Sequence, residues 1–146
     1  MTAKLVAYLT RCNGERMMAV IDKNTTKTLR EMEDRLWLEG ETAYRELARP
    51  DIRIAFPMPI GLRQGIERVV EGLSQQPSWS RLERHSSGHG VQQNTAVVHY
   101  EVTAFTENQD EDPQHFLVSS TWQISSKSQQ WELISRALIS ASDGFD

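Results

Sequence analysis

Three segments in the C-terminal half of the chain alternate apolar and polar residues, and this alternation constrains the fold more than any other feature. In TAVVHYEVTAF (95–105), Val98, Tyr100 and Val102 share one parity, and His99 and Glu101 lie between them. HFLVSSTWQI (115–124) and WELISRALIS (131–140) follow, each after a polar segment. Because side chains alternate between the two faces of a strand, these segments predict an antiparallel sheet with one buried face.

Two further segments precede these strands. WSRLERHS (79–86) is a less regular strand, and SSGHGVQQN (86–94) has the composition of a turn region. The segment DIRIAFPM (51–58) alternates Ile52, Ile54 and Phe56 with polar or small residues, which predicts an earlier strand with one buried face. Pro57 in this segment and Pro59 just after it lack a backbone donor, so this strand is expected at an edge or at a bend.

Helical spacing dominates the rest of the N-terminal half. Thr28 and Glu31 have capping-box spacing, which predicts a helix starting near Thr28 and ending at Gly40. A second helix covers ETAYRELA (41–48), and a third begins near Ile66. Helices grouped before an antiparallel meander indicate the α+β class. We expect a conical barrel, in which a curved antiparallel sheet wraps around the N-terminal helices.

The first residues predict an addition to this domain. Asn13-Gly14 lies between the apolar runs LVAYLTRC and ERMMAVI, and this pair favours a tight hairpin turn. A helix over ERMMAVID is the alternative. We therefore divide the chain into an N-terminal extension (1–24), one α+β barrel domain (25–142) and a loose tail (143–146).

Composition excludes several classes of protein. The chain has 146 residues, a net charge of −4 and a pI of about 5.6, and its basic residues are scattered, so the sequence predicts no nucleic-acid partner. A single cysteine, Cys12, fits a reducing compartment. No apolar run is long enough for a signal peptide or a membrane span. We expect a cytoplasmic protein without a membrane partner.

The segment FPMPIGLRQGIERVVEGL (56–73) has two glycines but no catalytic motif. Gly65 is followed by Ile66 rather than by the Lys-Ser/Thr pair of a phosphate-binding loop, and no serine stands between the glycines. We interpret the segment as a corner between a strand and a helix, with Arg63 near the mouth of the cone.

The order of these elements resembles the nuclear transport factor two-like superfamily, in its SnoaL-like branch of small bacterial proteins. The likeness is carried by LWLEGETAYRELARPDIRIAFPMPIG, GIERVVEGLSQQPSW, AVVHYEVTA and FLVSSTWQI with QQWELISRALIS, over roughly residues 28 to 141. The resemblance implies a conical α+β barrel, often a homodimer, with a pocket between sheet and helices. It does not imply one activity, because members include isomerases, cyclases, dehydratases, hydrolases and proteins without known activity.

Acid–base catalysis is one function that the residues allow. His85 or His99 is the candidate base, acting with Tyr44 or Tyr100. Alternation places His99 opposite the predicted cavity face, which favours an outer surface or a dimer contact for it. No aspartate lies on the apolar face of a predicted strand. The spacing of His85 and His89 does not suit a metal outside a helix, so we expect neither a metal nor a cofactor.

Ligand binding is the function that the sequence favours. Aromatic and apolar residues from different elements share inward parity, and together with one serine they form the predicted ligand pocket: Trp37, Tyr44, Phe56, Met58, Trp79, Tyr100, Ser120 and Trp122. Such a pocket would take a small hydrophobic molecule. The alternatives are that these residues only fill the core, or that the protein is a structural homodimer module. Whether it is an enzyme stays open.

Overall fold

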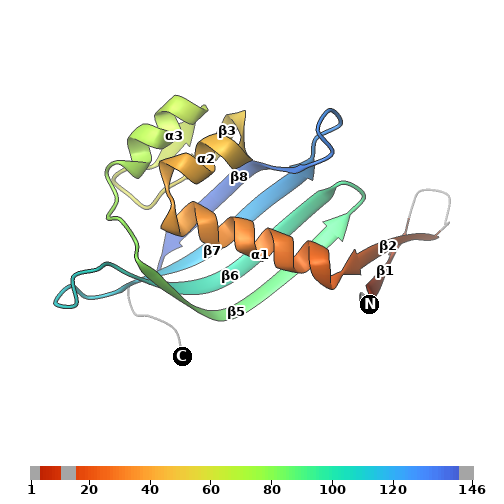
Figure 1. Ribbon diagram of the computed structural model, residues 1–146, viewed down its shortest axis with the longest axis horizontal. Coiled ribbons are helices and arrows are strands. Elements are labelled where there is room, and N and C mark those ends of the chain that lie inside the picture. The colour runs from red at the N-terminus through yellow and green to blue at the C-terminus, as the bar shows by residue number, and fades with distance from the viewer. Residues whose placement is uncertain (1–3, 11–15, 142–146) are drawn as a thin grey trace.

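A computed structural model describes residues 4–10 and 16–141 of the chain. Its main body is a six-stranded sheet with three helices (Figure 1). The helices are α1 (Lys23–Leu38), α2 (Glu41–Leu47) and α3 (Ile66–Leu73). The strands, in their order across the sheet, are β4 (Leu62–Gln64), β3 (Ala48–Ala55), β8 (Trp131–Ser140), β7 (Gln114–Ile124), β6 (Thr95–Phe105) and β5 (Arg81–Gln92).

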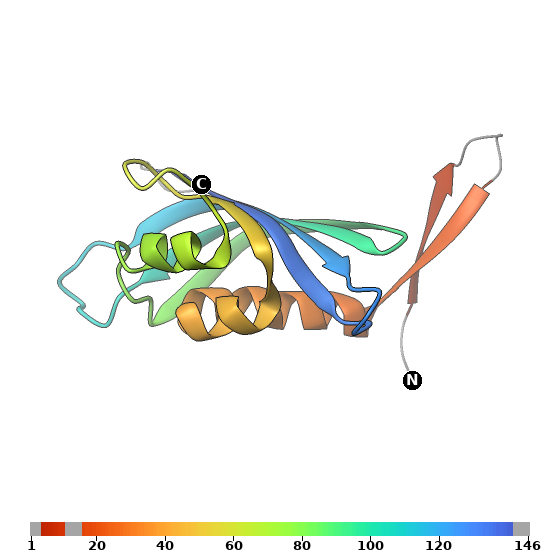
Figure 2. The same cartoon turned by 90° about the horizontal axis from the view of Figure 1, so that it is seen from above.

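The sheet is curved and open, and the helices lie on its inner side (Figures 1 and 2). Helix α1 crosses the face formed by β5, β6 and β7, while α2 and α3 lie towards β3 and β8. Apart from Thr103, the buried residues of β6 are those of the predicted parity, with Tyr100 and Val102 in the core. The α+β class and the curved sheet over N-terminal helices are therefore confirmed. The sheet is mixed, however, because β3 pairs with β8 in parallel.

Two predicted boundaries are wrong. Helix α1 begins at Lys23 instead of near Thr28, so Thr28 and Glu31 lie inside the helix and do not form its cap. The segment after His85 is not a turn, since β5 continues to Gln92. In this part of β5, residues 87–92 pair with residues 100–95 of β6. Serine and glycine have a low propensity for strands, so the backbone hydrogen bonds to β6 keep the segment extended.

The N-terminal hairpin is present as a separate two-stranded sheet. Strand β1 (Lys4–Thr10) pairs antiparallel with β2 (Arg16–Asp22), and Ala7 lies opposite Ala19. The alternative of a helix over ERMMAVID is therefore excluded. The predicted Asn13-Gly14 turn and the tail at 143–146 lie outside the described residues.

The segment 56–73 forms a corner, as expected. The backbone N–H of Phe56 donates to the Gly61 carbonyl (3.0 Å), and the chain then forms β4 and α3. Gly61 and Gly65 have φ of 73° and 90°, a region that favours glycine. Arg63 does not lie at the mouth of the cavity described below, because it forms an ion pair with Glu71 on α3 (3.1 Å).

None of the helices in the described part of the chain has the length and apolar character needed to cross a bilayer.

Candidate ligand-binding site

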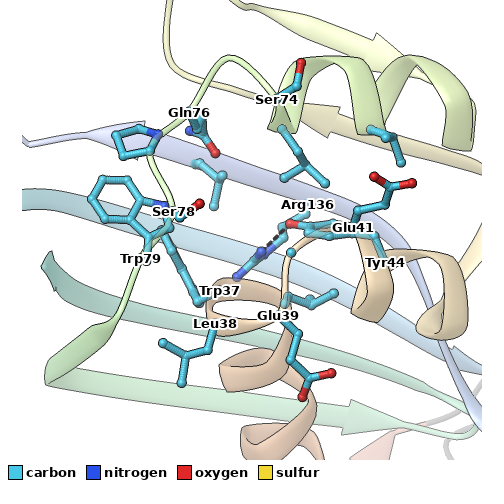
Figure 3. A pocket seen from close by; sticks show the side chains of 16 residues that line it. Trp37, Leu38, Glu39, Glu41, Tyr44, Ser74, Gln76, Ser78, Trp79 and Arg136 are labelled. Atoms are coloured by element: carbon cyan, nitrogen blue, oxygen red, sulfur yellow. Dashed lines mark hydrogen bonds between the residues drawn. The ribbon is translucent and has the colours of Figure 1, made fainter. Parts of the chain in front are cut away.

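A cavity opens between the helices and the sheet at one end of the body (Figure 3). Its lining comes from the end of α1, the first residues of α2, the end of α3, the segment 74–79 and strand β8. The cavity has a volume of about 230 Å³. Elements from both halves of the sequence therefore meet around one space.

Aromatic rings form one wall of this cavity. The ring centroids of Trp37 and Trp79 are 6.1 Å apart at an interplanar angle of 66°, an edge-to-face arrangement. Phe116 supports both, at 5.2 Å from Trp37 and 5.8 Å from Trp79. Such contacts fix the rings beyond what burial alone would do. This wall of the cavity is therefore apolar and aromatic.

Arg136 and Tyr44 bring polar groups to the floor. Figure 3 shows the guanidinium of Arg136 in the middle of the ring of lining side chains. Arg136 is only 2% exposed, and one of its Nη1–H groups donates to the hydroxyl of Tyr44. Its inward position depends on a bulge in β8, where the register with β7 shifts between Ser135 and Leu133. The bulge reverses the alternation, so that Leu133, Arg136 and Leu138 are all buried.

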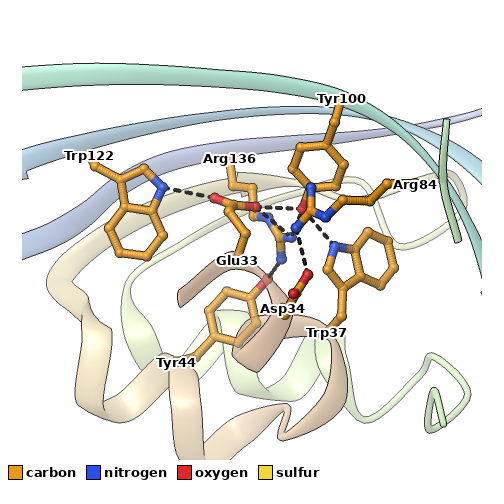
Figure 4. A network of polar contacts seen from close by, with 8 residues as sticks. All are labelled: Glu33, Asp34, Trp37, Tyr44, Arg84, Tyr100, Trp122 and Arg136. Carbon is orange, nitrogen blue, oxygen red and sulfur yellow. Dashed lines mark hydrogen bonds and ion pairs between the residues drawn. The ribbon is translucent and has the colours of Figure 1, made fainter. Parts of the chain in front are cut away.

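Glu33 of α1 compensates the charge of Arg136 beneath the cavity (Figure 4). Its Oε1 accepts from Arg136 Nη2 (3.1 Å) and from the Tyr100 hydroxyl (2.6 Å), and its Oε2 accepts from Trp122 Nε1 (2.8 Å). The carboxylate is completely buried. A buried ion pair is tolerated only when such additional hydrogen bonds satisfy it.

Tyr100 connects this ion pair to the aromatic wall. Its hydroxyl accepts from Trp37 Nε1 (2.8 Å) and from Arg136 Nη2 (2.9 Å) while it donates to Glu33. The guanidinium of Arg84, which binds Asp34 (2.6 Å), lies 4.0 Å from the Tyr100 ring centroid. Burial raises the pKa of Tyr100, and the nearby Glu33 raises it further. The hydroxyl therefore stays protonated and acts as a donor.

Burial also raises the pKa of Tyr44, against the opposing effect of Arg136. For Arg136 itself, burial works to lower the pKa, but the oxygens of Tyr44, Tyr100 and Glu33 outweigh it and the pKa is raised. Both groups at the floor are therefore protonated hydrogen-bond donors. Neither can serve as a base near neutral pH.

Two polar atoms near the floor have no hydrogen-bond partner among the described residues: Arg136 Nε and Ser120 Oγ. Ser120 and Arg136 are register partners on β7 and β8. Unpaired buried polar atoms are uncommon and call for a structural or functional explanation. Here the orphan donor belongs to a side chain that lines a cavity.

The mouth is acidic, but its carboxylates are paired. Glu39 accepts from Arg35 (2.9 Å), and this hydrogen bond lowers the pKa of Glu39. Glu41 accepts from Arg45 Nε (2.8 Å). A carboxylate with a lowered pKa is a poor proton acceptor, so Glu39 is not suited to act as a catalytic base in this cavity.

The structure brings some of the predicted pocket residues together and separates others. Trp37, Tyr44 and Trp79 line the cavity. Behind its floor, Tyr100 and Trp122 bind Glu33, and Ser120 is buried beside Arg136.

Phe56 and Met58 lie elsewhere. Phe56 is buried against Gly72 of α3. Met58 is 82% exposed on the loop between β3 and β4, because the bend there turns it away from the core. Both line a separate, open hollow beside the C-terminal end of β8.

Neither candidate histidine reaches the cavity. His99 is exposed on the face of β6 opposite Tyr100. His85 forms a hydrogen bond from Nε2 to Thr103 Oγ1 (2.6 Å), and Thr103 is also bonded to His115 Nδ1 (2.9 Å). Among the described residues, no three His, Cys, Asp or Glu side chains are grouped as metal ligands.

Sequence comparison gives no family for this chain: it matches no protein-family model, and no curated protein is significantly similar. Structure comparison is informative. The fold superimposes on a protein from Parabacteroides distasonis that is provisionally assigned as a ketosteroid isomerase, with a TM-score of 0.70 and 15% identity, covering 82% of this chain and 90% of that one.

Two other solved structures agree. An NTF2-like protein from Cytophaga hutchinsonii gives a TM-score of 0.64 at 12% identity, covering 81% of this chain and 99% of that one. The association domain of C. elegans CaMKII gives 0.62 at 14% identity, covering 80% and 92%. The chain has the nuclear transport factor 2-like (NTF2-like) fold. The predicted superfamily likeness is thereby confirmed at the level of the fold, and the SnoaL-like branch stays a prediction.

Proposed function

We propose that this NTF2-like protein binds a small, flat, mostly apolar molecule that carries a neutral hydrogen-bond acceptor such as a carbonyl oxygen. The observation that carries the proposal is the buried guanidinium of Arg136, which lines the cavity together with the protonated Tyr44 and donates to its hydroxyl. The Nε–H of Arg136 has no partner among the described residues. A guanidinium and a phenol hydroxyl in the lining of one cavity are both able to donate to an acceptor oxygen. The edge-to-face pair of Trp37 and Trp79 suits an aromatic or planar body.

Charge favours a neutral ligand over a carboxylate. Arg136 is already compensated by Glu33, so an anion would leave one uncompensated negative charge in a buried site. The cavity volume of about 230 Å³ lies below the range of drug-sized ligands, which indicates a compound of metabolite size.

Binding is favoured over turnover because no described side chain in the cavity is placed as a base. Both oxygens of Glu33 already accept hydrogen bonds, and His85 and His99 lie outside the cavity. One observation supports an acid–base enzyme as the second candidate: donors on Arg136 and Tyr44 could stabilise an enolate oxygen. In that case, a bound ketone would exchange its α-hydrogens in deuterated buffer faster than the free ketone does.

The binding proposal is tested with three compounds of one shape: 1-indanone, indane and indane-1-carboxylate. A ligand that binds only the native state raises Tm, and Trp37 and Trp79 should report it by a change in fluorescence. We expect 1-indanone to bind more tightly than indane, and the carboxylate to bind least. Equal binding of ketone and carboxylate would contradict the charge argument, and no binding of any of the three would count against the cavity.

A bulky side chain at the mouth of the cavity tests whether the ligand binds there. Ser78 is exposed and lines the cavity, so Ser78→Trp should abolish the response to 1-indanone. Ser126→Trp, on the exposed turn between β7 and β8, should leave the response unchanged. Loss of the response in both variants would mean that the ligand binds elsewhere.

We also propose that the protein is a homodimer, and that it works in the cytoplasm. Two of the similar structures are named as a CaMKII association domain and a CaMKII hub, which supports self-association of this fold. The single cysteine of the sequence fits a reducing compartment. Sedimentation analysis of the full chain measures its oligomeric state.

A further inference from the structure

The outer edges of the N-terminal hairpin have no strand partner in the described part of the chain. Strands β1 and β2 form a sheet of their own and pair with no strand of the six-stranded sheet. In both views the hairpin extends beyond the main body, joined to it where β2 runs into α1 and close to it at β5 (Figures 1 and 2). A lone two-stranded hairpin is marginally stable in water, and three or more strands are generally needed.

The sequence of the hairpin is typical of strands whose side chains and edges are buried against another part of a protein. All interior positions, 5–9 on β1 and 17–21 on β2, are apolar. Charged residues stand only at the ends, at Lys4, Arg16 and Asp22. Neither strand has a proline or an interior charge, which are the usual devices that protect a free edge from pairing.

Strand β2 is complementary to itself. If two copies of RMMAVID pair antiparallel over their full length, Ala19 lies on the twofold axis opposite Ala19 of the partner subunit. Arg16 then lies opposite Asp22 of the partner subunit, and by symmetry the opposite-charge pair occurs twice. Strand β1 offers no such match, since full-length pairing about Ala7 places Lys4 opposite Thr10.

We propose that two copies of this chain associate by antiparallel pairing of β2 with β2, which forms a continuous four-stranded sheet in the order β1-β2-β2-β1. This inference rests on the homodimer proposed above and names its interface. The arrangement is sterically simple: β2 leads directly into α1 at Lys23, so antiparallel pairing places the two main bodies at opposite ends of the shared sheet. A strand of seven residues separates them by about 24 Å.

The charge pairs give the decisive experiment. In Arg16→Asp, both pairs become acid against acid, and in Asp22→Arg both become base against base. We expect each variant alone to dimerise on the order of tenfold more weakly than wild type. A one-to-one mixture of the two variants restores both opposite-charge pairs, so the mixture should form heterodimers with near wild-type affinity. Sedimentation or native mass spectrometry measures all three samples.

Cross-linking locates the axis. In a Cys12→Ser background, A19C should form a disulfide dimer under mild oxidation, because opposed residues of antiparallel strands have Cα atoms about 4.5–5.5 Å apart, within disulfide range. A7C is the matched control on β1 and should not cross-link. Cross-linking of A7C alone would overturn the proposal in favour of β1 pairing.

The remaining outcomes are separable. A wild-type chain that is monomeric at all accessible concentrations would refute both the homodimer and this interface. A wild-type dimer that persists unchanged in Arg16→Asp and in Asp22→Arg would refute the interface alone. A monomer that floats with vesicles of phosphatidylcholine and phosphatidylserine would overturn the proposal by showing that the apolar hairpin binds lipid instead.

Discussion

Glu33 and Arg136 hold opposite charges in a part of the protein that water does not reach. The two are 103 positions apart in sequence, and both are almost completely buried. Taking two charges out of water costs several kcal/mol each. This is offset only by their pairing, by the hydrogen bonds that Tyr100 and Trp122 donate to Glu33, and by the one that Tyr44 accepts from Arg136. The pair therefore specifies how α1 sits against β8 more than it stabilises the fold.

Removing only one charge of the Glu33–Arg136 pair should lower the free energy of unfolding more than removing both charges. Glu33→Gln leaves Arg136 buried without a counter-charge, and we expect a loss of about 3–5 kcal/mol in the free energy of unfolding. The double variant Glu33→Gln/Arg136→Met removes both charges, keeps an amide oxygen as an acceptor for the donors on Tyr100 and Trp122, and should lose less than Glu33→Gln alone. Urea unfolding measures both, with Glu31→Gln as the control on the exposed side of α1. A double variant that loses the sum of two single losses would contradict a compensated pair.

Alkaline pH should destabilise the protein through its buried tyrosines. The pKa values of Tyr44 and Tyr100 are raised in the folded state, so above pH about 10 the unfolded chain releases protons that the folded chain retains. The free energy of unfolding should then fall with increasing pH by up to about 1.4 kcal/mol per pH unit for each tyrosine. Below the ordinary tyrosine pKa, neither group contributes any dependence on pH.

Tyr44→Phe isolates one of these two tyrosines. Its stability should fall about half as steeply as that of wild type between pH 10 and 11.5, as measured by denaturant unfolding at fixed pH. Equal slopes in both proteins would show that Tyr44 titrates normally in the folded state.

The sequence predicted the aromatic part of the site but not its charges. Trp37, Tyr44 and Trp79 could be found from their parity or helical spacing. Glu33 had a usable signal, since it lies four residues after Leu29 and four before Trp37 on the apolar face of α1. Arg136 had none, because simple alternation from Leu133 places it outward and only the bulge in β8 turns it inward.

At the scale of elements, α3 packs closely against Phe56 through Gly72. A Cβ atom added at Gly72 would lie 2.8 Å from Phe56 Cε2, which is inside contact distance. Helical propensity alone favours alanine over glycine by about 1 kcal/mol. In this case we expect the steric clash with Phe56 to outweigh the gain in helical propensity, because the ring of Phe56 is itself buried and cannot easily move.

Gly72→Ala should therefore destabilise the protein by about 1–3 kcal/mol in thermal or urea unfolding. Gly88→Ala is the control, since nothing lies within 4 Å of a Cβ atom added there. A stability equal to or above wild type in Gly72→Ala would show that α3 moves away from the sheet at little cost.

Element boundaries were less predictable than element types. The strands β6 and β7 followed from alternation, because their buried residues share one parity almost throughout, and β8 was predicted as a strand although its bulge interrupts the alternation. The start of α1 and the extent of β5 did not follow from local sequence. The segment SSGHG has the composition of a turn, but pairing with β6 keeps it extended, an example of tertiary structure overriding local propensity.

At the scale of the whole molecule, the body and the hairpin are distinct units. The hairpin has its own sheet, whereas the core, the cavity and the network of Glu33 belong to the body. A chain that begins at Lys23 should therefore keep the fold of the body and its response to 1-indanone. Far-ultraviolet circular dichroism and the binding assay test this, and the same chain should sediment as a monomer. An unfolded product would show that the hairpin stabilises the body.

The overall architecture could be predicted because it follows from the order and type of the elements. Helices come first in the chain, and an antiparallel meander that curves over them follows. The parallel pairing of β3 with β8 could not, because the sequence contains no signal for which edge β3 joins. The same limit applies to the cavity, whose volume depends on how closely side chains from distant segments approach.

The distance along the chain between Glu33 and Arg136 also sets an order of events during synthesis. When α1 leaves the ribosome, the strand that carries its counter-charge has not yet been made. Docking the helix earlier would bury a lone carboxylate, which is strongly unfavourable. We therefore expect α1 to remain undocked until β8 emerges, so that the nascent protein acquires its core late and in a single step.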